Sequence, residues 1–279
     1  MDGKRSLRVV SFGGAAVALA ALGAAGMVFA QATTAPVKPP AARGGRPVPQ
    51  HMTPDYTVEV AGIKPIVMPL WEGRDAPGQI KNAPPEWDDG TGRIRGVTEP
   101  AIIVYLPPEG HRNGVAIVAC MGGSYEHLTK LVGADETVKT FVPQGVAIIS
   151  LKYRLKPPST HVEDDALADG RRAVQVVRYH AKEWGIDPHK VGMSGWSAGG
   201  NLILNQVTHP VEPPHVGDGD GVLVHSSRPD FVGLMSPWPD AHTPDFYPIP
   251  KDAPPAFIGN AEDDRTAPVT FAKAIGEAW

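Results

Sequence analysis

The sequence predicts an α/β domain with a mainly parallel β-sheet and helices on both of its faces. From about residue 100 onward, short apolar runs alternate with stretches of helical periodicity, which is typical of strand–helix–strand units. The apolar runs are continuous rather than alternating, and this favours strands that are buried on both faces of the sheet. With 279 residues, of which 42% are hydrophobic, the chain can form a sizeable core and is not predominantly disordered.

Six apolar runs predict the strands in chain order. They cover residues 101–106, 115–120, 146–151, 190–194, 231–235 and 256–258. A long helix is expected between Asp164 and Trp184, because small and apolar residues recur there at three- and four-residue steps and form one stripe. Acidic residues open this helix, and Gly185 can close it in the left-handed conformation. Further helices are expected to begin near Ser197 and to run up to Trp279.

The first thirty residues have the composition of an export signal. Basic residues open the chain, an uncharged run rich in Ala and Gly follows, and candidate cleavage points come at Ala30 and Ala32. An uncleaved membrane anchor is the alternative, because the run is long enough to span a bilayer. We expect residues 1–30 to be a cleaved signal peptide, so that the protein is secreted or periplasmic and has no stable membrane association. Residues 31–54 are rich in Pro and Ala, which predicts a disordered linker before the folded domain of residues 55–279.

Charge and cysteine content exclude several partners. The chain carries 26 Lys and Arg against 30 Asp and Glu, a net charge of −4, so it has no excess of positive charge for nucleic acid. Cys120 is the only cysteine, which rules out an intrachain disulfide and argues against a cysteine-rich zinc site. The Asp-Gly-Asp-Gly run at residues 218–221 lacks the closing Glu of a calcium loop, and a polar turn is the better interpretation. We therefore expect no metal, no cofactor and no nucleic-acid partner.

The strongest motif is Gly-Trp-Ser-Ala-Gly-Gly at residues 195–200, between a predicted strand and a predicted helix. This is the setting of a nucleophile elbow, in which a serine lies on a sharp turn whose backbone presses against the adjoining elements. Gly195 and Gly199 provide the space that such a turn needs. The following helix directs its N-terminal N–H groups and the positive end of its dipole toward developing negative charge. Ser197 is therefore a candidate nucleophile.

Two further segments follow predicted strands. Met-Gly-Gly-Ser-Tyr at residues 121–125 comes directly after the second strand, and its glycines allow backbone N–H groups to approach an oxyanion closely. Glu-Asp-Asp-Arg-Thr-Ala-Pro at residues 262–268 follows the last predicted strand, where the acid of a serine-hydrolase triad belongs. Three adjacent acids leave the choice open, although for Glu262 a solvated turn is the better interpretation.

Other blocks accompany these motifs along the chain. They are Leu-Trp-Glu-Gly at 70–73, Ala-Pro-Gly at 76–78, Lys-Tyr-Arg-Leu at 152–155, Glu-Trp-Gly-Ile-Asp-Pro at 183–188 and Arg-Pro-Asp-Phe at 228–231. In this order the blocks resemble the α/β-hydrolase-fold esterases of the acetyl-esterase and acetylxylan-esterase-like group, including relatives near feruloyl esterases. The resemblance runs from about Leu70 to the end of the chain and implies an α/β-hydrolase fold with a carboxylesterase activity.

The resemblance also implies a role for each matching residue. Ser197 is expected to be the nucleophile and Asp264 the acid of the triad. The family places its aspartate three residues before a Val-Pro or similar pair, and Ala267-Pro268 stands at that place. The backbone N–H groups that would form the oxyanion hole belong to Gly123, Ser124 and Ala198.

The segment at residues 121–125 departs from the family at two positions. The family usually has Pro-Gly-Gly-Gly-Tyr, whereas this chain has Met121 and Ser124. Ser124 keeps its N–H group, but its side chain can crowd the site. We expect the side chains of Tyr125 and His127 to contact the substrate.

The base of the triad is missing from the expected place. The family's histidine follows its aspartate by some tens of residues, after one more strand, and the fifteen residues after Asp264 contain no histidine. We therefore expect a domain that lacks the last strand and helix of the fold, with the strand at 256–258 as an exposed sheet edge. The upstream histidines have no spacing that favours a base or a metal ligand.

Two functions follow from these observations. The first is an exported serine carboxylesterase that hydrolyses short-chain acyl esters, acetyl esters above all, on plant polysaccharide or on small molecules. The reaction would pass through an acyl-enzyme on Ser197 and need no cofactor. The alternative is a truncated, inactive hydrolase that binds carbohydrate or is vestigial, because a serine hydroxyl without a base is a poor nucleophile. A serine peptidase on the same fold is a third interpretation, but the chain has no room for the additional domain that many of these peptidases carry.

Overall fold

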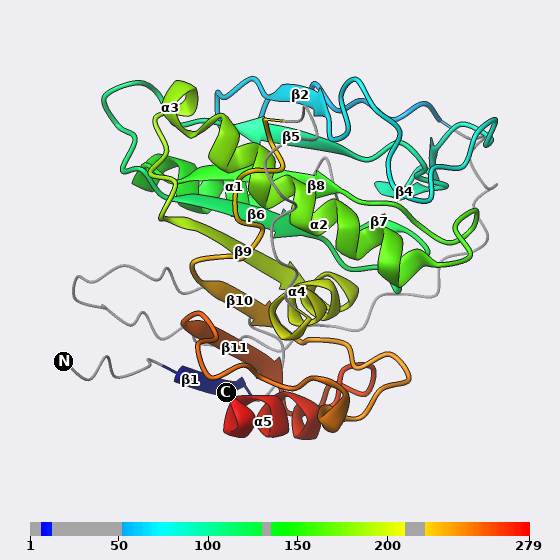
Figure 1. Ribbon diagram of the computed structural model, residues 1–279, viewed down its shortest axis with the longest axis vertical. Coiled ribbons are helices and arrows are strands. Elements are labelled where there is room, and N and C mark those ends of the chain that lie inside the picture. The colour runs from blue at the N-terminus through cyan, green and yellow to red at the C-terminus, as the bar shows by residue number, and fades with distance from the viewer. Residues whose placement is uncertain (1–6, 13–51, 130–134, 210–220) are drawn as a thin grey trace, which may run out of the picture.

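One eight-stranded sheet organises the chain, of which the computed structural model describes residues 7–12, 52–129, 135–209 and 221–279 (Figure 1). The strands are β1 (Leu7–Phe12), β2 (Ile66–Pro69), β5 (Ala101–Tyr105), β6 (Ala116–Cys120), β8 (Ala147–Lys152), β9 (Val191–Trp196), β10 (Val232–Met235) and β11 (Ala256–Ala261). Their order across the sheet is β1-β11-β10-β9-β6-β8-β5-β2. Neighbours from β1 to β8 are parallel, whereas β5 runs antiparallel to both β8 and β2. The predicted, mainly parallel sheet is confirmed.

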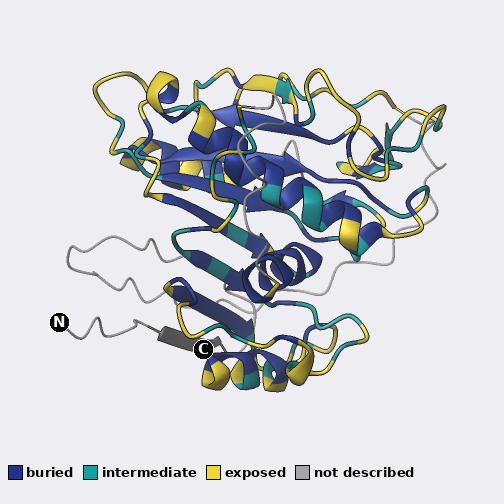
Figure 2. Ribbon diagram, viewed as in Figure 1, coloured by how far each residue is buried: buried dark blue, intermediate teal, exposed yellow. Residues whose placement is uncertain are grey.

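The central strands are buried on both faces. Every residue of β5, β6 and β8 is buried, and Figure 2 shows these strands in dark blue along most of their length. Each of the six predicted runs overlaps one observed strand. A continuous apolar run was therefore the correct signal for a strand covered from both sides.

Helices cover the two faces of the sheet. α2 (Val162–Tyr179) packs against α4 (Ala198–Thr208), and both contact β9. α1 (Asp135–Phe141) lies in the connection from β6 to its neighbour β8. α2 lies in the next connection, which returns from β8 past β6 to β9. The two connections therefore cross the sheet in opposite directions. Because such crossovers are right-handed, α1 lies on the face opposite to α2 and α4. α5 (Val269–Ala278) follows β11 and packs against it.

Several short elements complete the described part of the chain. Three strands form a small antiparallel sheet in the order β3-β4-β7. The short elements are β3 (Trp87–Asp88), β4 (Arg93–Arg95), β7 (Leu128–Thr129), η1 (Val142–Gln144), α3 (Ala181–Trp184) and η2 (Pro244–Phe246). None of the helices in the described ranges is long and apolar enough to cross a membrane.

The helix predicted over residues 164–184 is interrupted at His180. The backbone of His180 has φ −87° and ψ 5°, and its N–H is shared between two carbonyls of the last turn of α2. This geometry ends α2, and α3 continues the path as a separate turn. Gly185 closes α3 in the left-handed conformation with φ 63°, as predicted.

The strand at residues 256–258 was expected to be an exposed edge, but β1 covers it. β1 pairs with β11 in parallel register from Leu7↔Ala256 to Phe12↔Ala261. The position next to β11 is thus filled by residues that lie within the expected signal peptide. The other residues of that segment lie outside the described part of the chain, and cleavage of the signal stays a prediction.

One described residue of the predicted linker pairs with the folded domain. Met52, which we placed in the linker of residues 31–54, forms a β-bridge with Asp88 through hydrogen bonds of 3.2 and 2.8 Å. Residues 31–51 lie outside the described part of the chain. The bridge of Met52 thus lies within the last three residues of the predicted linker, and the bounds of the linker and the domain stay a prediction.

Candidate active site

Ser197 lies on a sharp turn between β9 and α4. Its backbone has φ 52° and ψ −119°, a conformation that costs free energy for any residue with a side chain and is concentrated at functional sites. The Ser197 N–H donates to the Met235 carbonyl at 3.0 Å, which ties the turn to β10. The Ser197 carbonyl accepts from Asn201 at 2.9 Å and from Trp238 at 3.2 Å. The strand, sharp turn and helix predicted around Ser197 are confirmed.

Glycines allow this turn to pack against the sheet. A Cβ atom at Gly195 would lie 2.4 Å from the Gly199 carbonyl oxygen, and one at Gly199 would lie 2.0 Å from the Cys120 carbonyl oxygen. A Cβ at Gly122 would lie 2.8 Å from the Trp196 carbonyl oxygen and 3.0 Å from the Ser197 Cβ. These contacts leave no room for side chains. They also place the loop that begins at Gly122 directly beside Ser197.

That loop has three successive residues with positive φ. The values are 142° for Gly123, 55° for Ser124 and 59° for Tyr125. Thr129 braces the loop, since its N–H and hydroxyl donate to the Gly122 carbonyl at 3.0 and 2.8 Å. The N–H groups of Gly123 and Ser124 donate to no other described residue. They are thus available to an oxygen beside Ser197, as the prediction of an oxyanion hole requires.

Ala198, the third residue predicted for the oxyanion hole, is the first residue of α4. The N–H groups of the first helical turn have no acceptor within their own helix. The eleven residues of α4 also align their peptide dipoles so that the positive end points toward Ser197. The helix terminus therefore favours negative charge at this place.

Tyr125 is buried, with 1% of its surface exposed. Its hydroxyl donates to Asn201 Oδ1 at 2.8 Å, and its ring meets that of Tyr153 edge-on at 5.9 Å. Asn201 Nδ2 in turn donates to the Tyr247 hydroxyl at 2.8 Å and to the Trp238 carbonyl at 2.9 Å. Tyr125 thus anchors its loop on α4, and its predicted contact with substrate stays a prediction.

His127 lies against the same loop. A Cβ at Gly123 would lie 3.0 Å from His127 Cδ2. Partial burial lowers the pKa of His127, and the positive charges of Arg95 and Arg93 lower it further. Nδ1 is buried and has no hydrogen-bond partner among the described residues. His127 is therefore a neutral imidazole near pH 7, and its contact with substrate stays a prediction.

Asp264 follows β11 on a turn that holds its carboxylate. Asp264 Oδ1 accepts from the N–H groups of Thr266 and Ala267, both at 2.9 Å. Asn260 stabilises the same turn, because its Nδ2 donates to the Ala267 carbonyl at 2.9 Å. The neighbouring Glu262 and Asp263 are exposed. Of the three adjacent acids, Asp264 is the one whose carboxylate accepts hydrogen bonds from its own turn.

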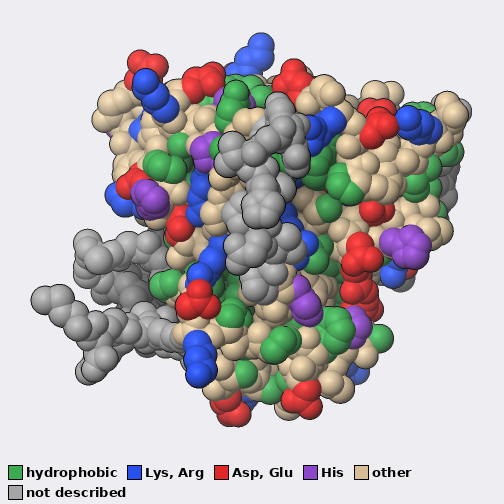
Figure 3. Space-filling model, viewed as in Figure 1, with side chains coloured by type: hydrophobic (Ala, Val, Ile, Leu, Met, Phe, Trp, Pro, Cys, Tyr) green, Lys and Arg blue, Asp and Glu red, His purple; other side chains and the backbone are tan. Residues whose placement is uncertain are grey.

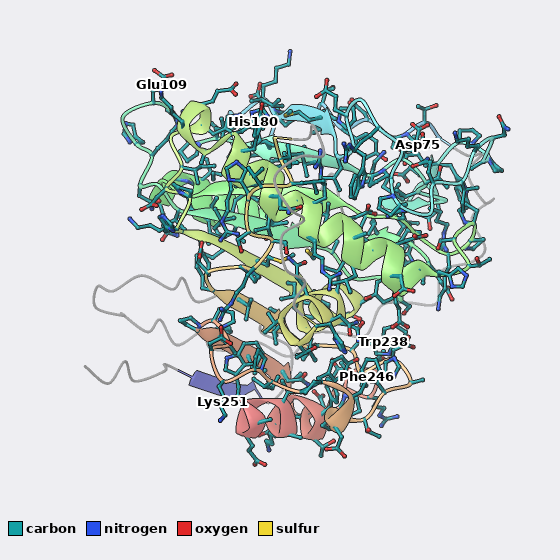
Figure 4. All side chains as sticks on the ribbon, viewed as in Figure 1. Asp75, Glu109, His180, Trp238, Phe246 and Lys251 are labelled. Atoms are coloured by element: carbon teal, nitrogen blue, oxygen red, sulfur yellow. The ribbon has the colours of Figure 1, made fainter. Side chains whose placement is uncertain are left out.

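The sheet brings Ser197 and Asp264 to the same edge. They follow the ends of β9 and β11, which run parallel on either side of β10, so about two strand spacings, or ~10 Å, separate them. Figure 4 labels Trp238, which donates to the Ser197 carbonyl, at this edge. No histidine in the described ranges donates to or accepts from Ser197 or Asp264. The expected nucleophile and acid are thus brought to one edge without a base between them in this part of the chain.

Comparisons with known proteins agree with this geometry. Residues 102–209 match the family model described as BD-FAE. The chain is 28% identical over 197 residues to an acetylxylan esterase of Xylanibacter ruminicola, an alignment that covers 65% of this chain and 38% of that protein. It is 31% identical over 122 residues to carboxylesterase NlhH of Mycobacterium tuberculosis, covering 43% and 37%. This chain therefore spans less than two fifths of either relative.

Solved structures show the same fold. An acetyl ester-xyloside bifunctional hydrolase of Caldicellulosiruptor lactoaceticus superposes with a TM-score of 0.59 at 24% identity, covering 76% of this chain and 80% of that one. Propionate-bound esterase 2 of Thermogutta terrifontis gives 0.57 at 22% identity, covering 80% and 82%. The chain therefore has the α/β-hydrolase fold.

A buried ionic cluster lies close to the candidate site, and no motif in the sequence predicts it. Arg154, 2% exposed, donates from Nε and Nη2 to the two Asp169 carboxylate oxygens, both at 2.9 Å. It also donates from Nη1 to Asp165 at 3.1 Å, and Trp71 Nε1 donates to Asp169 at 2.9 Å. The adjacent Tyr153 hydroxyl donates to the Met121 carbonyl. The cluster thus joins the segment after β2, the segment after β8 and α2, and Tyr153 connects it to the loop at residues 121–125.

The described part of the chain contains no group of three or more His, Cys, Asp or Glu side chains that could hold a metal ion. The calcium interpretation of residues 218–221 falls mainly outside the described ranges.

Proposed function

We propose that this protein is a serine carboxylesterase that forms an acyl-enzyme on Ser197. The observation that supports this most is the strained backbone of Ser197, at φ 52°, at the N-terminus of α4 and against Gly122. Strain of this kind persists only where the surroundings enforce it. Here the close glycine contacts of the turn enforce the strain. The same contacts hold the Ser197 hydroxyl beside the loop that carries the N–H groups of Gly123 and Ser124. The names of the relatives, which are esterases, agree with this assignment.

The chemistry begins when Ser197 Oγ attacks the acyl carbon of the ester. The carbonyl oxygen gains negative charge, which the N–H groups of Gly123, Ser124 and Ala198 stabilise more strongly than they stabilise the neutral carbonyl. The alcohol leaves with a proton, and water then hydrolyses the acyl-Ser197 intermediate. An imidazole that accepts the Ser197 proton would be held by Asp264, whose Oδ1 is already fixed by two amides.

The substrate we propose is a short-chain acyl ester, with acetyl groups on a plant polysaccharide as the first choice. Two of the similar proteins are named for acetyl esters of xylan or xylosides. Ser124 stands at a position where the family usually has glycine, and we expect its side chain to narrow the space beside Ser197. A small acyl group is compatible with that restriction.

We further propose that the protein is exported and loses residues 1–30. The support is the basic start and the uncharged, Ala- and Gly-rich run that follows. Cleavage removes Leu7–Phe12 and so leaves β11 without its neighbour β1. N-terminal sequencing of the protein recovered from the periplasm or the medium tests this: a start at Gln31 or Thr33 supports it, and a start at Met1 contradicts it.

The test of the proposed activity is the Ser197→Ala variant. Hydrolysis of p-nitrophenyl acetate and release of acetate from acetylated xylan should both fall by about 10³-fold or more. Ser194→Ala is the matched control, because it removes a hydroxyl from the same strand three residues earlier and should leave the rate within about twofold. Full activity in Ser197→Ala would overturn the proposal.

A second candidate is a carbohydrate-binding protein that keeps the fold without turnover. It is favoured by the lack of any histidine in contact with Ser197 or Asp264 among the described residues. Binding of acetylated xylo-oligosaccharides without acetate release would support this candidate. A covalent fluorophosphonate adduct on Ser197 would contradict it, because such an adduct requires an activated hydroxyl.

A further inference from the structure

A cavity of about 1000 Å³ lies at the opposite edge of the sheet from Ser197. Its walls include Pro188 and His189, which precede β9, Asp230, which precedes β10, and Pro255, which precedes β11. Ser197 follows the far end of β9, and six residues of strand span about 20 Å. Figure 4 shows Lys251, beside the cavity residue Asp252, on one side and Trp238, beside Ser197, on the other. The cavity is therefore separate from the candidate active site.

One buried arginine holds the walls of this cavity in place. Arg178, 8% exposed, donates from Nε to the Pro188 carbonyl at 2.9 Å and from Nη1 to the carbonyls of Ser226 and Arg228 at 2.5 and 2.7 Å. Its Nη2 donates to Asp230 Oδ2 at 2.9 Å. The same Oδ2 also accepts a hydrogen bond from the Val191 N–H. One guanidinium thus joins the end of α2 to the starts of β9 and β10, and the cavity is preformed.

Among the charged side chains that line the cavity, one cation has no acidic partner in the described part of the chain. Arg178 is paired with Asp230, and Arg228 Nη1 is paired with Asp252 at 2.5 Å. Lys182 also lines the cavity and makes no ion pair with another described residue. The side chains of His189 and His225 line it as well. In Figure 3, basic, acidic and histidine side chains lie next to one another on the part of the surface where β9, β10 and β11 begin.

The cavity also presents an exposed aromatic ring. Tyr179 is 51% exposed, and its ring meets those of His180 at 5.0 Å and His225 at 6.1 Å, both edge-on. Neighbouring rings therefore fix the orientation of an aromatic surface that stays open to solvent. Four proline rings belong to the apolar part of the wall: Pro188, Pro229, Pro254 and Pro255. A few charged groups set among aromatic and apolar walls are typical of ligand sites.

We infer that this cavity binds an acidic saccharide, with a sugar ring against Tyr179 and a carboxylate beside Lys182, His189 and Arg228. The choice of a saccharide rests on the proposed function, because the two similar proteins named for acetyl esters are also named for xylan or xylosides. The choice of an acidic one rests on the unpaired Lys182. Such a site holds the polymer about 20 Å away from Ser197 and raises the local concentration of its ester groups.

The test is calorimetric binding to the Ser197→Ala protein, in which no ester is consumed. The probes are xylotriose, the same trisaccharide carrying one glucuronic acid, and inorganic phosphate, at a pH of about 6.5. The acidic trisaccharide should bind at least about tenfold more tightly than xylotriose. The double variant Lys182→Gln and His189→Gln should bind the acidic trisaccharide about fivefold more weakly or worse. Tyr179→Ala should bind both saccharides more weakly.

Lys64→Gln is the control, because Lys64 is exposed and lies two residues before β2, at the other end of the strand order. It should leave binding unchanged. Equal binding of both trisaccharides, or no effect of the Lys182 and His189 substitutions, would overturn the inference. Displacement of the acidic trisaccharide by phosphate at equal concentration would show a general anion site and would also overturn it. Because binding is measured without catalysis, failure here is distinct from failure of the esterase proposal.

Discussion

The Tyr125 hydroxyl donates a hydrogen bond of 2.8 Å to Asn201 Oδ1, and this bond ties the loop after β6 to the helix that begins behind Ser197. Tyr125 is 1% exposed and Asn201 is fully buried. Asn201 also donates to Tyr247 and to the Trp238 carbonyl. The relative position of the loop amides and of Ser197 therefore depends on a buried polar network rather than on the loop alone.

Tyr125→Phe tests this dependence. The change removes the only hydroxyl that donates from the loop to α4 among the described residues, and should lower the free energy of unfolding by about 1–2 kcal/mol. With the loop less firmly held, kcat should fall by about tenfold while KM changes little. Tyr179→Phe removes an exposed hydroxyl instead and serves as the control in urea unfolding and ester kinetics. An unchanged kcat in a folded Tyr125→Phe protein would argue against a positioning role.

Gly199→Ala tests the close contact beneath the turn. The added Cβ would lie 2.0 Å from the Cys120 carbonyl oxygen, so the turn has to shift or the protein has to unfold. We expect a loss of more than about 3 kcal/mol in unfolding free energy, or no soluble protein. Gly110→Ala is the comparison, because nothing lies within 4 Å of its added Cβ. It costs about 1 kcal/mol for its positive φ alone. Similar stability of the two variants would contradict the contact.

Asp264→Asn separates the candidate acid from its neighbours. The Asn Oδ1 can still accept from Thr266 and Ala267, so the turn should keep its shape while the negative charge is lost. Ester hydrolysis should fall by about 10³- to 10⁴-fold without a change in unfolding free energy above about 1 kcal/mol. Asp263→Asn removes an exposed charge one residue earlier, and its kinetics should match those of the unmodified protein. A large loss in Asp263→Asn but not in Asp264→Asn would reverse the assignment.

Arg154→Met tests the buried ionic cluster. Removing the guanidinium leaves the carboxylate of Asp169 without its main partner and should cost about 3–5 kcal/mol at neutral pH. Desolvation already raises the pKa of Asp169, although the Arg154 hydrogen bonds and charge oppose this shift. Without Arg154 the pKa rises further, so the folded protein takes up the proton more readily than the unfolded chain does.

The sign of the pH dependence follows from that shift. A carboxylate whose pKa is higher in the folded state loses stability as pH rises through the window between its unfolded and folded values. The stability difference between Arg154→Met and the unmodified protein should thus be larger near pH 8 than near pH 4.5 in urea unfolding. Asp75→Asn, an exposed carboxylate paired with Lys81, is the control and should show no such trend. A difference that is independent of pH would contradict the buried charge.

The sequence was informative where local chemistry determines the structure. Continuous apolar runs located all six predicted strands, because a strand buried on both faces accepts mainly apolar residues. The glycines around Ser197 located the turn, because its crowded backbone leaves no room for side chains. The motifs, taken in their order along the chain, were enough to reveal a resemblance to the esterase family. The placement of Ser197 and Asp264 at one edge then follows from the parallel sheet.

Long-range pairing could not be predicted in the same way. The run Leu-Arg-Val-Val-Ser-Phe at residues 7–12 suits the start of an export signal and a strand equally well, so its pairing with β11 was missed. The Arg154–Asp169 cluster joins residues from β8 and α2 to Trp71, which is distant in sequence, and no spacing rule connects them. Burial of Tyr125 was likewise invisible, because its partner Asn201 is 76 positions away.

The central claim is that Ser197 is an activated nucleophile, and covalent labelling tests it most directly. The purified protein is treated with a fluorophosphonate, digested, and its peptides are identified by mass spectrometry. The account predicts one adduct on Ser197, abolished in Ser197→Ala and in Asp264→Asn but retained in Ser194→Ala. An unlabelled Ser197 in a protein that still hydrolyses esters would contradict the account.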